Sequence, residues 1–184
     1  MDSYYLSNVA FFGFAVYSVF FIVFKRFSFY TKNTIYSKID QAAITVVGLA
    51  GLLYAGIWIY EISAILIGDD ASHKNQLLRR MTGKYAIGFW LQPLTYIFFS
   101  QMVWFKNIAN HSLLRFIIAF FLFLNFEKCV IIMVTIHRDY LPSSWTMFED
   151  YSIFGWIISG WLIKLVFFTS MVTVTNYIKN RRTL

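Results

Sequence analysis

Apolar residues occur in five long blocks along the chain. The blocks cover approximately residues 8–27, 41–67, 85–105, 113–136 and 153–178. Each is about as long as the roughly 20 helical residues that cross a hydrocarbon layer about 30 Å thick. Apolar residues run continuously within the blocks, and lipid does not tolerate open sheet edges, so strands are not expected. The pattern predicts an all-α integral membrane protein in which residues 1–184 form one bundle of five transmembrane helices.

The composition agrees with this pattern. Of the 184 residues 59% are hydrophobic, 21% are aromatic and only 14% are charged, whereas a soluble domain carries roughly 25% charged residues. The polar connections between the blocks contain the expected Gly, Asn, Asp and Ser residues. Two of them, "GDDASHKNQLLRRMTGK" and "HRDYLPSSWTMFEDYS", are long enough to form small structured caps.

The net charge of +7 does not indicate nucleic-acid binding, because the basic residues are mostly in the connections. This arrangement is typical of loops that face anionic lipid headgroups. More Lys and Arg residues lie on one predicted side than on the other, which favours an amino terminus outside and a carboxyl terminus in the cytoplasm. The richer side contains Lys25, Arg26, Lys32, Lys38, Lys106, Arg115, Lys179, Arg181 and Arg182, and the other side contains Lys74, Arg79, Arg80, Lys84 and Arg138.

No pattern in the sequence indicates a cofactor or metal held by this chain. Cys129 is the single cysteine, which excludes an intrachain disulfide and a cysteine-based metal or iron–sulfur site. His73 and His111 lie in connections and His137 lies at a block end, so a haem held by two histidines inside the bundle is not expected. No Ser-His-Asp arrangement, phosphate-binding glycine loop or metal-ligand spacing is present.

Several polar residues interrupt the apolar blocks. A charge near the middle of a bilayer costs roughly 2.5 kcal/mol or more, so it normally faces protein or water and has a partner. At 1.5 Å per residue, Glu127 lies about 14 Å and Lys164 about 17 Å from the outer ends of consecutive antiparallel helices, so the two can meet. Lys128 points about 100° away from Glu127 and needs another acceptor. Glu61 and Gln92 are also expected in the outer half.

These residues predict a polar cluster that opens to the outside and contains Glu61, Gln92, Glu127 and Lys164. One interpretation is a structural ion pair between Glu127 and Lys164 that fixes the helix register. The other is a proton path, or the polar edge of a small-molecule pocket. The Glu127–Lys164 pair would be costly to break under either interpretation, because an unpaired charge would remain in a medium of low dielectric constant.

The segment "EKCVIIMVTIHRDYLPSSW" resembles the carboxyl-terminal half of the NrfD/polysulfide-reductase membrane-subunit family. The similarity is closest to the quinol-interacting membrane subunits of alternative complex III. "YEISAILIG", "TGKYAIGFW" and "SQMVWFKN" follow the family's order upstream, so the resemblance covers about residues 42–178. The motif residues kept here are Glu127, His137, Arg138, Asp139, Leu141, Pro142, Ser143, Ser144 and Trp145.

The resemblance implies half of a two-bundle architecture, since family members resemble two four-helix bundles in series. In the family, quinol chemistry is assigned mainly to the amino-terminal bundle beside an iron–sulfur subunit. The chain departs from the family where "YSKIDQA" replaces a His-His-containing stretch, and Lys128, Cys129 and Tyr140 replace Arg, Phe and Phe. The resemblance therefore implies a non-catalytic membrane-anchor subunit, with quinol or quinone at an interface rather than bound by this chain alone.

The same resemblance implies a place in a respiratory complex of a bacterial cytoplasmic membrane. The expected partners are lipids, other membrane subunits and an iron–sulfur or multihaem cytochrome subunit outside the cytoplasm. The outer connection would dock that subunit, or it would simply be a capped turn at the membrane interface. Two rival functions are a structural or assembly subunit without a redox or proton role, and a small proton or cation transporter or channel. The docking candidates are His137, Arg138, Asp139, Ser143, Ser144 and Trp145.

Overall fold

A computed structural model describes residues 3–25, 34–68, 70–84, 86–124 and 151–182. The regular elements of these residues are all α-helices, so the predicted all-α class is confirmed for the described part of the chain. The helices are α1 (Tyr5–Lys25), α3 (Thr34–Ile67), α4 (Ala71–Thr82), α5 (Ala86–Met102), α6 (Lys106–Asn110), α7 (Ser112–Phe123) and α9 (Tyr151–Arg182).

Three of these helices are long and apolar enough to cross a membrane. They cover Tyr5–Lys25, Ile35–Ile67 and Ile158–Arg181. The predicted block 85–105 forms α5, which is shorter and contains Pro93. The predicted block 113–136 is described only as far as Phe123, the end of α7. The structure thus supports a helical membrane protein with three candidate spans, and five spans remain a prediction.

The connections contain more helix than the sequence pattern predicts. α3 begins at Thr34, well before the predicted residue 41. The polar connection after α3 forms the helix α4, in agreement with the structured cap predicted there. α4 begins after Asp70, whose side chain accepts hydrogen bonds from the backbone nitrogens of Ser72 at 2.9 Å and His73 at 3.4 Å. This carboxylate satisfies backbone donors that have no partner within the helix.

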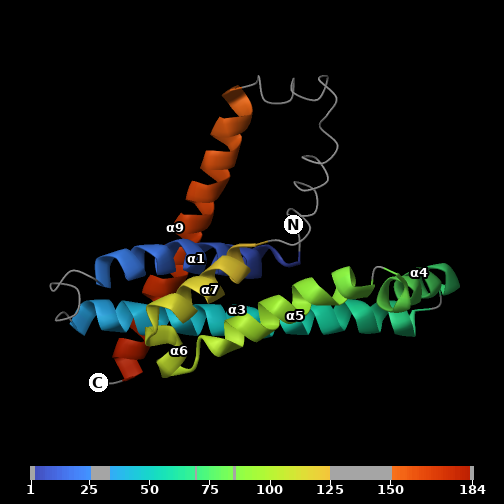
Figure 1. The fold of residues 1–184 in the computed structure, drawn as a ribbon, viewed down its shortest axis with the longest axis horizontal. Coiled ribbons are helices and arrows are strands. Elements are labelled where there is room, and N and C mark those ends of the chain that lie inside the picture. The colour runs from blue at the N-terminus through green and yellow to red at the C-terminus, as the bar shows by residue number, and fades with distance from the viewer. Residues whose placement is uncertain (1–2, 26–33, 69, 85, 125–150, 183–184) are drawn as a thin grey trace.

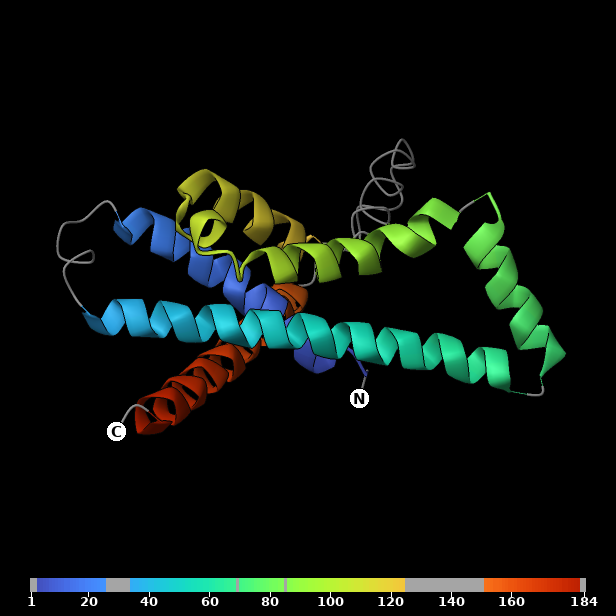
Figure 2. The ribbon, with the colours of Figure 1, turned by 90° about the horizontal axis from the view of Figure 1, so that it is seen from below.

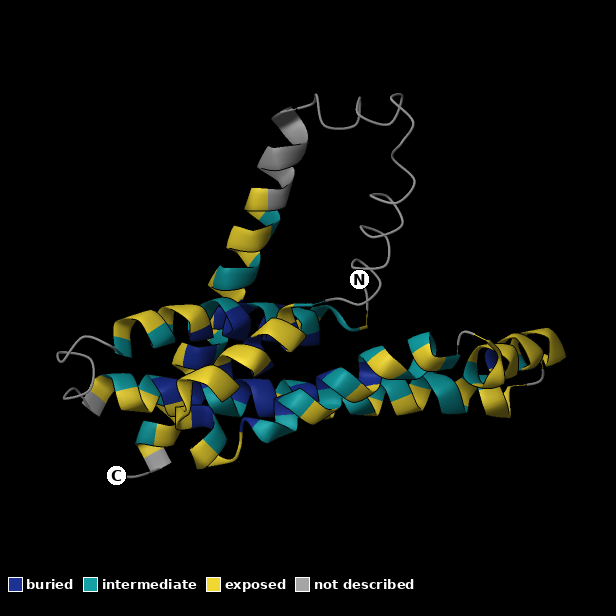
Figure 3. Cartoon of the chain, viewed as in Figure 1, coloured by how far each residue is buried: buried dark blue, intermediate teal, exposed yellow. Residues whose placement is uncertain are grey.

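The longer helices form two packed pairs, which a further helix crosses. α1 packs along α7, and α3 packs along α5, while α1 and α3 also pack against each other. Figures 1 and 2 show that α9 crosses α1 and α3 steeply instead of running beside them. The buried residues gather where α1, α3, α7 and α9 meet, whereas α4 is largely exposed (Figure 3).

The core is aromatic and aliphatic, with a close approach between α3 and α5. Its fully buried members include Phe11 and Phe14 of α1 and Val47 of α3. A side chain at Gly48 would overlap the indole of Trp104, and the Gly48 carbonyl accepts a hydrogen bond from Gln101 at 3.0 Å. A small residue here lets the two backbones come close enough for this contact, as is common between membrane helices.

Candidate functional site

A buried ion pair joins α7 to α3. The Nη2 atom of Arg115 lies 2.6 Å from Oδ1 of Asp40, and Nη1 lies 3.2 Å from Oδ2. Arg115 is 1% exposed and Asp40 is 7% exposed. Two parallel N–H···O contacts between a guanidinium and a carboxylate are a strong and directional arrangement. The pair therefore fixes how the start of α3 lies against α7.

Two nitrogens and the face of the Arg115 guanidinium have further partners. Nε donates to Oγ of Ser18 in α1 at 3.3 Å, and Nη1 donates to the carbonyl of Ala109 at 3.4 Å. The guanidinium carbon lies 3.9 Å from the centre of the Phe21 ring, which gives a cation–π contact. One side chain thus contacts α1, α3 and the residues of α6.

The chemistry of this centre is mainly structural. A guanidinium does not lose its proton in proteins, so Arg115 cannot pass a proton on. The carboxylate of Asp40 also accepts a hydrogen bond from Oη of Tyr17 at 3.3 Å. An ion pair this well satisfied holds three helices together, and the loss of one partner would leave a buried charge unpaired.

The sequence pattern did not indicate this pair. Arg115 was counted only with the basic residues of one predicted side, and Asp40 was placed in the connection before the predicted block 41–67. In the structure both lie inside helices and in the core. One signal could have revealed them: Asp40 is the only acid in the connections of its predicted side, and Arg115 stands at a block end on the same side, where each would otherwise remain a charge without a partner.

A second polar centre lies at the other end of α3. The hydroxyl of Tyr4 donates to Oε2 of Glu61 at 2.5 Å, and Glu61 is half-buried. Tyr4 also packs against the ring of Tyr54, with 4.8 Å between the ring centres, and Tyr54 packs against Tyr96 at 5.5 Å. Glu61 thus accepts a hydrogen bond from a phenol at the edge of an aromatic cluster.

The predicted outward-opening cluster is only partly within the described residues. Glu61 and Lys164 are not joined directly: Glu61 accepts from Tyr4, and Nζ of Lys164 lies 5.5 Å above the ring of Phe12. Gln92 is half-buried on α5. Neither a hydrogen bond nor an ion pair links these three side chains to one another in the described ranges. Glu127 and Lys128 lie outside those ranges, so the predicted Glu127–Lys164 pair stays a prediction.

The predicted docking residues of the outer connection also lie outside the described residues. These are His137, Arg138, Asp139, Ser143, Ser144 and Trp145. Within the described ranges, no group of three or more His, Cys, Asp or Glu residues is close enough together to hold a metal ion.

The fold and the two polar centres define an all-α protein with three helices suited to span a membrane. Comparison with protein-family models, with characterised proteins and with solved structures finds no match for this chain.

Proposed function

We propose that the chain is a membrane-anchor subunit of a respiratory, quinol-linked electron-transfer complex in a bacterial cytoplasmic membrane. It would hold partner subunits at the membrane, with quinol or quinone at an interface between subunits. The observation that carries this proposal is the motif "HRDYLPSSW", preceded by Glu127 and the aliphatic run before His137. This motif resembles the outer connection of the NrfD-like membrane subunits.

The exposed surface of α9 supports the anchoring role. Only 11% of the most apolar stretch of α9 is buried, compared with 44% for α1 and 39% for α3. Its large side chains, such as Leu162, Val166 and Phe167, are at least half exposed. In a membrane such a helix contacts lipid or other membrane helices, and helix association there depends on close packing. A second membrane subunit that supplies the other bundle would pack on this helix.

The Tyr4–Glu61 contact supports a proton-handling role near the outer end of α3. A carboxyl group with a hydrogen-bonding phenol can exchange a proton when a neighbouring reaction supplies or takes one. In the proposal, Glu61 acts together with Glu127 and Lys164, and the outer connection docks an electron-transfer subunit. The chain itself carries no redox step.

Purification of the full chain from its native membranes in a mild detergent tests the proposal. We expect an iron–sulfur protein, a multihaem cytochrome or a second NrfD-like membrane subunit to co-purify in fixed ratio, as identified by mass spectrometry. In that complex, Glu127→Gln should lower quinol-dependent turnover and leave the amount of protein in the membrane nearly unchanged. A chain that purifies alone, or only with subunits of another class, would contradict the anchoring role.

The buried Asp40–Arg115 pair favours one alternative, a structural or assembly subunit without a proton role. This pair holds helices together and offers no proton to a reaction. For such a subunit, Glu127→Gln would leave electron flux normal, whereas Arg138 or Trp145 variants would lose the complex. Turnover and the yield of complex, measured on the same membranes, distinguish the two functions.

A further inference from the structure

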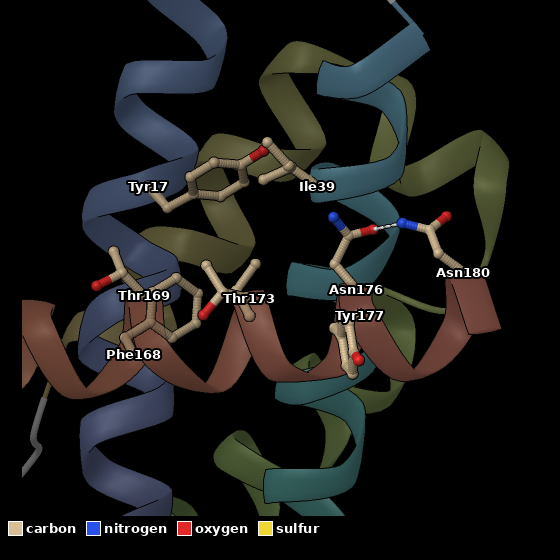
Figure 4. A pocket seen from close by; sticks show the side chains of 9 residues that line it. Tyr17, Ile39, Phe168, Thr169, Thr173, Asn176, Tyr177 and Asn180 are labelled. Atoms are coloured by element: carbon tan, nitrogen blue, oxygen red, sulfur yellow. Dashed lines mark hydrogen bonds between the residues drawn. The ribbon is translucent and has the colours of Figure 1, made fainter.

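A cavity of about 360 Å³ lies where α9 crosses α1 and α3 (Figure 4). Apolar groups make most of its wall: Ile39 comes from α3, and Phe168 and Val172 come from α9. Asn176 and Asn180 line the end nearest the end of α9. The cavity is thus almost entirely apolar, with two amide side chains at one end, which matches an elongated apolar molecule with a polar group at one end.

The polar end offers a hydrogen-bond donor. Nδ2 of Asn180 donates to Oδ1 of Asn176 at 3.4 Å. With its oxygen used in this way, Asn176 has its own amide nitrogen left as a donor, and that nitrogen donates to no described residue. Figure 4 shows it turned away from Asn180, on the side of Tyr17 and Ile39. An oxygen atom of a bound molecule could accept this hydrogen bond.

A positive charge lies close to one residue of the cavity wall. The guanidinium carbon of Arg181 lies 5.0 Å above the ring of Tyr177, and Tyr177 lines the cavity. No carboxylate lines the cavity among the described residues. Asp40 lies behind Tyr17, and its charge is paired with Arg115. Among the described residues, the charge nearest the amide end of the cavity is therefore positive.

The cavity lies near the ends of the helices that form it. Asn176 is six residues before the end of α9, and Ile39 is five residues after the start of α3. In a membrane that these helices cross, their ends lie near the level of the lipid headgroups. A basic residue beside a pocket between membrane helices favours an anionic headgroup at this level.

We propose that this cavity binds an anionic glycerophospholipid. One acyl chain would lie along Ile39, Phe168 and Val172. The Asn176 amide would donate to an ester or phosphate oxygen, and Arg181 would pair with the negative headgroup. A zwitterionic phosphatidylcholine headgroup should bind more weakly, because its ammonium group meets no carboxylate among the described residues of the cavity. This site is independent of the quinol-linked role proposed above.

Spin-label measurements on the full chain test the site. The chain is reconstituted into phosphatidylcholine bilayers that contain a small fraction of spin-labelled phosphatidylglycerol or, separately, spin-labelled phosphatidylcholine. We expect the phosphatidylglycerol label to be immobilised preferentially. Arg181→Gln should lower that preference about fivefold, the effect of one cation beside an anionic headgroup. Arg181→Lys should keep most of it, since the charge remains.

Two further variants separate the site from general changes. Asn176→Leu should weaken immobilisation of both labels, because it removes the amide donor. Ser170→Leu changes the same helix at an exposed serine that does not line the cavity, and it should have no effect. Equal immobilisation of the two labels by the unaltered chain, or an unchanged preference in Arg181→Gln, would overturn the proposal. Displacement of the label by an uncharged quinone as effectively as by unlabelled phosphatidylglycerol would also overturn it.

Discussion

Asp40 and Arg115 lie 75 positions apart in the chain, and their side chains form a two-point ion pair in the core. Through Ser18 and the Phe21 ring the same guanidinium also contacts α1. The arrangement of α1, α3 and α7 therefore depends on a charged residue at the centre of the contact. A charge in such a place stabilises the fold only while its partner is present.

Replacement of one partner tests this dependence. Arg115→Leu should lower the free energy of unfolding by about 3–5 kcal/mol, because Asp40 would remain buried without its counter-charge. Reversible unfolding in mixed micelles, followed by circular dichroism, measures the change. Arg80→Leu on the exposed α4 is the matched control and should have little effect.

The double variant Asp40→Leu with Arg115→Leu distinguishes pairing from general damage. It removes both charges, so it should recover a large part of the stability that Arg115→Leu loses. A double variant that is as unstable as the sum of the two single variants would show that the pair itself is not what holds these helices.

A glycine in α1 marks the crossing with α9. A Cβ atom at Gly13 would overlap the side chain of Phe168, which is buried, whereas one at Gly56 would meet nothing within 4 Å. Gly13→Ala should therefore cost about 1–3 kcal/mol from overpacking. Gly56→Ala should be neutral or stabilise by up to about 1 kcal/mol, since alanine favours helix. Equal effects in the same unfolding measurement would contradict the observed crossing of α1 and α9.

Hydrophobic patterning predicted the three candidate membrane spans but not which helices pack against each other. The long apolar blocks correspond to α1, α3 and α9, because continuous apolar residues of spanning length have few alternatives to helix. The helical part before residue 41 was missed, since Lys38 and Asp40 gave that stretch the composition of a connection. Arg115, near the start of the predicted block 113–136, was counted only for the difference in charge between the two sides. Pattern alone does not show which charge meets which, because pairing depends on helix rotation and crossing.

The steep crossing of α9 could not be predicted either. A block of spanning length indicates that a helix exists, but side-chain shape sets how it packs. Gly13 against Phe168 is one such contact, and it joins residues far apart in the sequence. The Tyr4–Glu61 contact is a further example. Glu61 was a candidate from its place in an apolar block, whereas Tyr4, which precedes the first block, gave no signal.

The cap of α4 should respond to acid. His73 Nδ1 lies 2.6 Å from the Asp70 carboxylate, and this hydrogen bond, together with those from Ser72, holds the pKa of Asp70 well below its usual range. Because the pKa of Asp70 is lowered in the folded state, the charged cap stabilises α4 fully at pH values above the usual pKa of about 3.9. This stabilisation is lost as the pH falls through the lowered pKa. Amide exchange at Ser72 and His73, corrected for its intrinsic pH dependence, should show constant protection from pH 8 to pH 5 and a loss only in stronger acid.

Variants at this cap should change the pH at which amide protection is lost. In His73→Ala the largest cause of the lowered pKa is removed, so protection should be lost at a higher pH than in the unaltered chain. In Asp70→Asn the cap keeps an acceptor oxygen but has no titrating group, so the acid-dependent step should disappear. A loss of protection at the same pH in all three proteins would show that another group controls α4.

Glu61 provides the sharpest test of the proposed proton role. Glu61→Gln keeps an oxygen that can accept the Tyr4 hydroxyl, so the free energy of unfolding should change little. It cannot bind or release a proton, so quinol-dependent turnover of the purified complex should fall at least tenfold if Glu61 takes part in proton transfer. Tyr4→Phe is the converse variant, because it keeps the carboxyl group and removes its hydrogen-bond donor. It should lower turnover less than Glu61→Gln does. Normal turnover in Glu61→Gln, with the complex intact, would remove Glu61 from the proton path and leave the chain with an anchoring role.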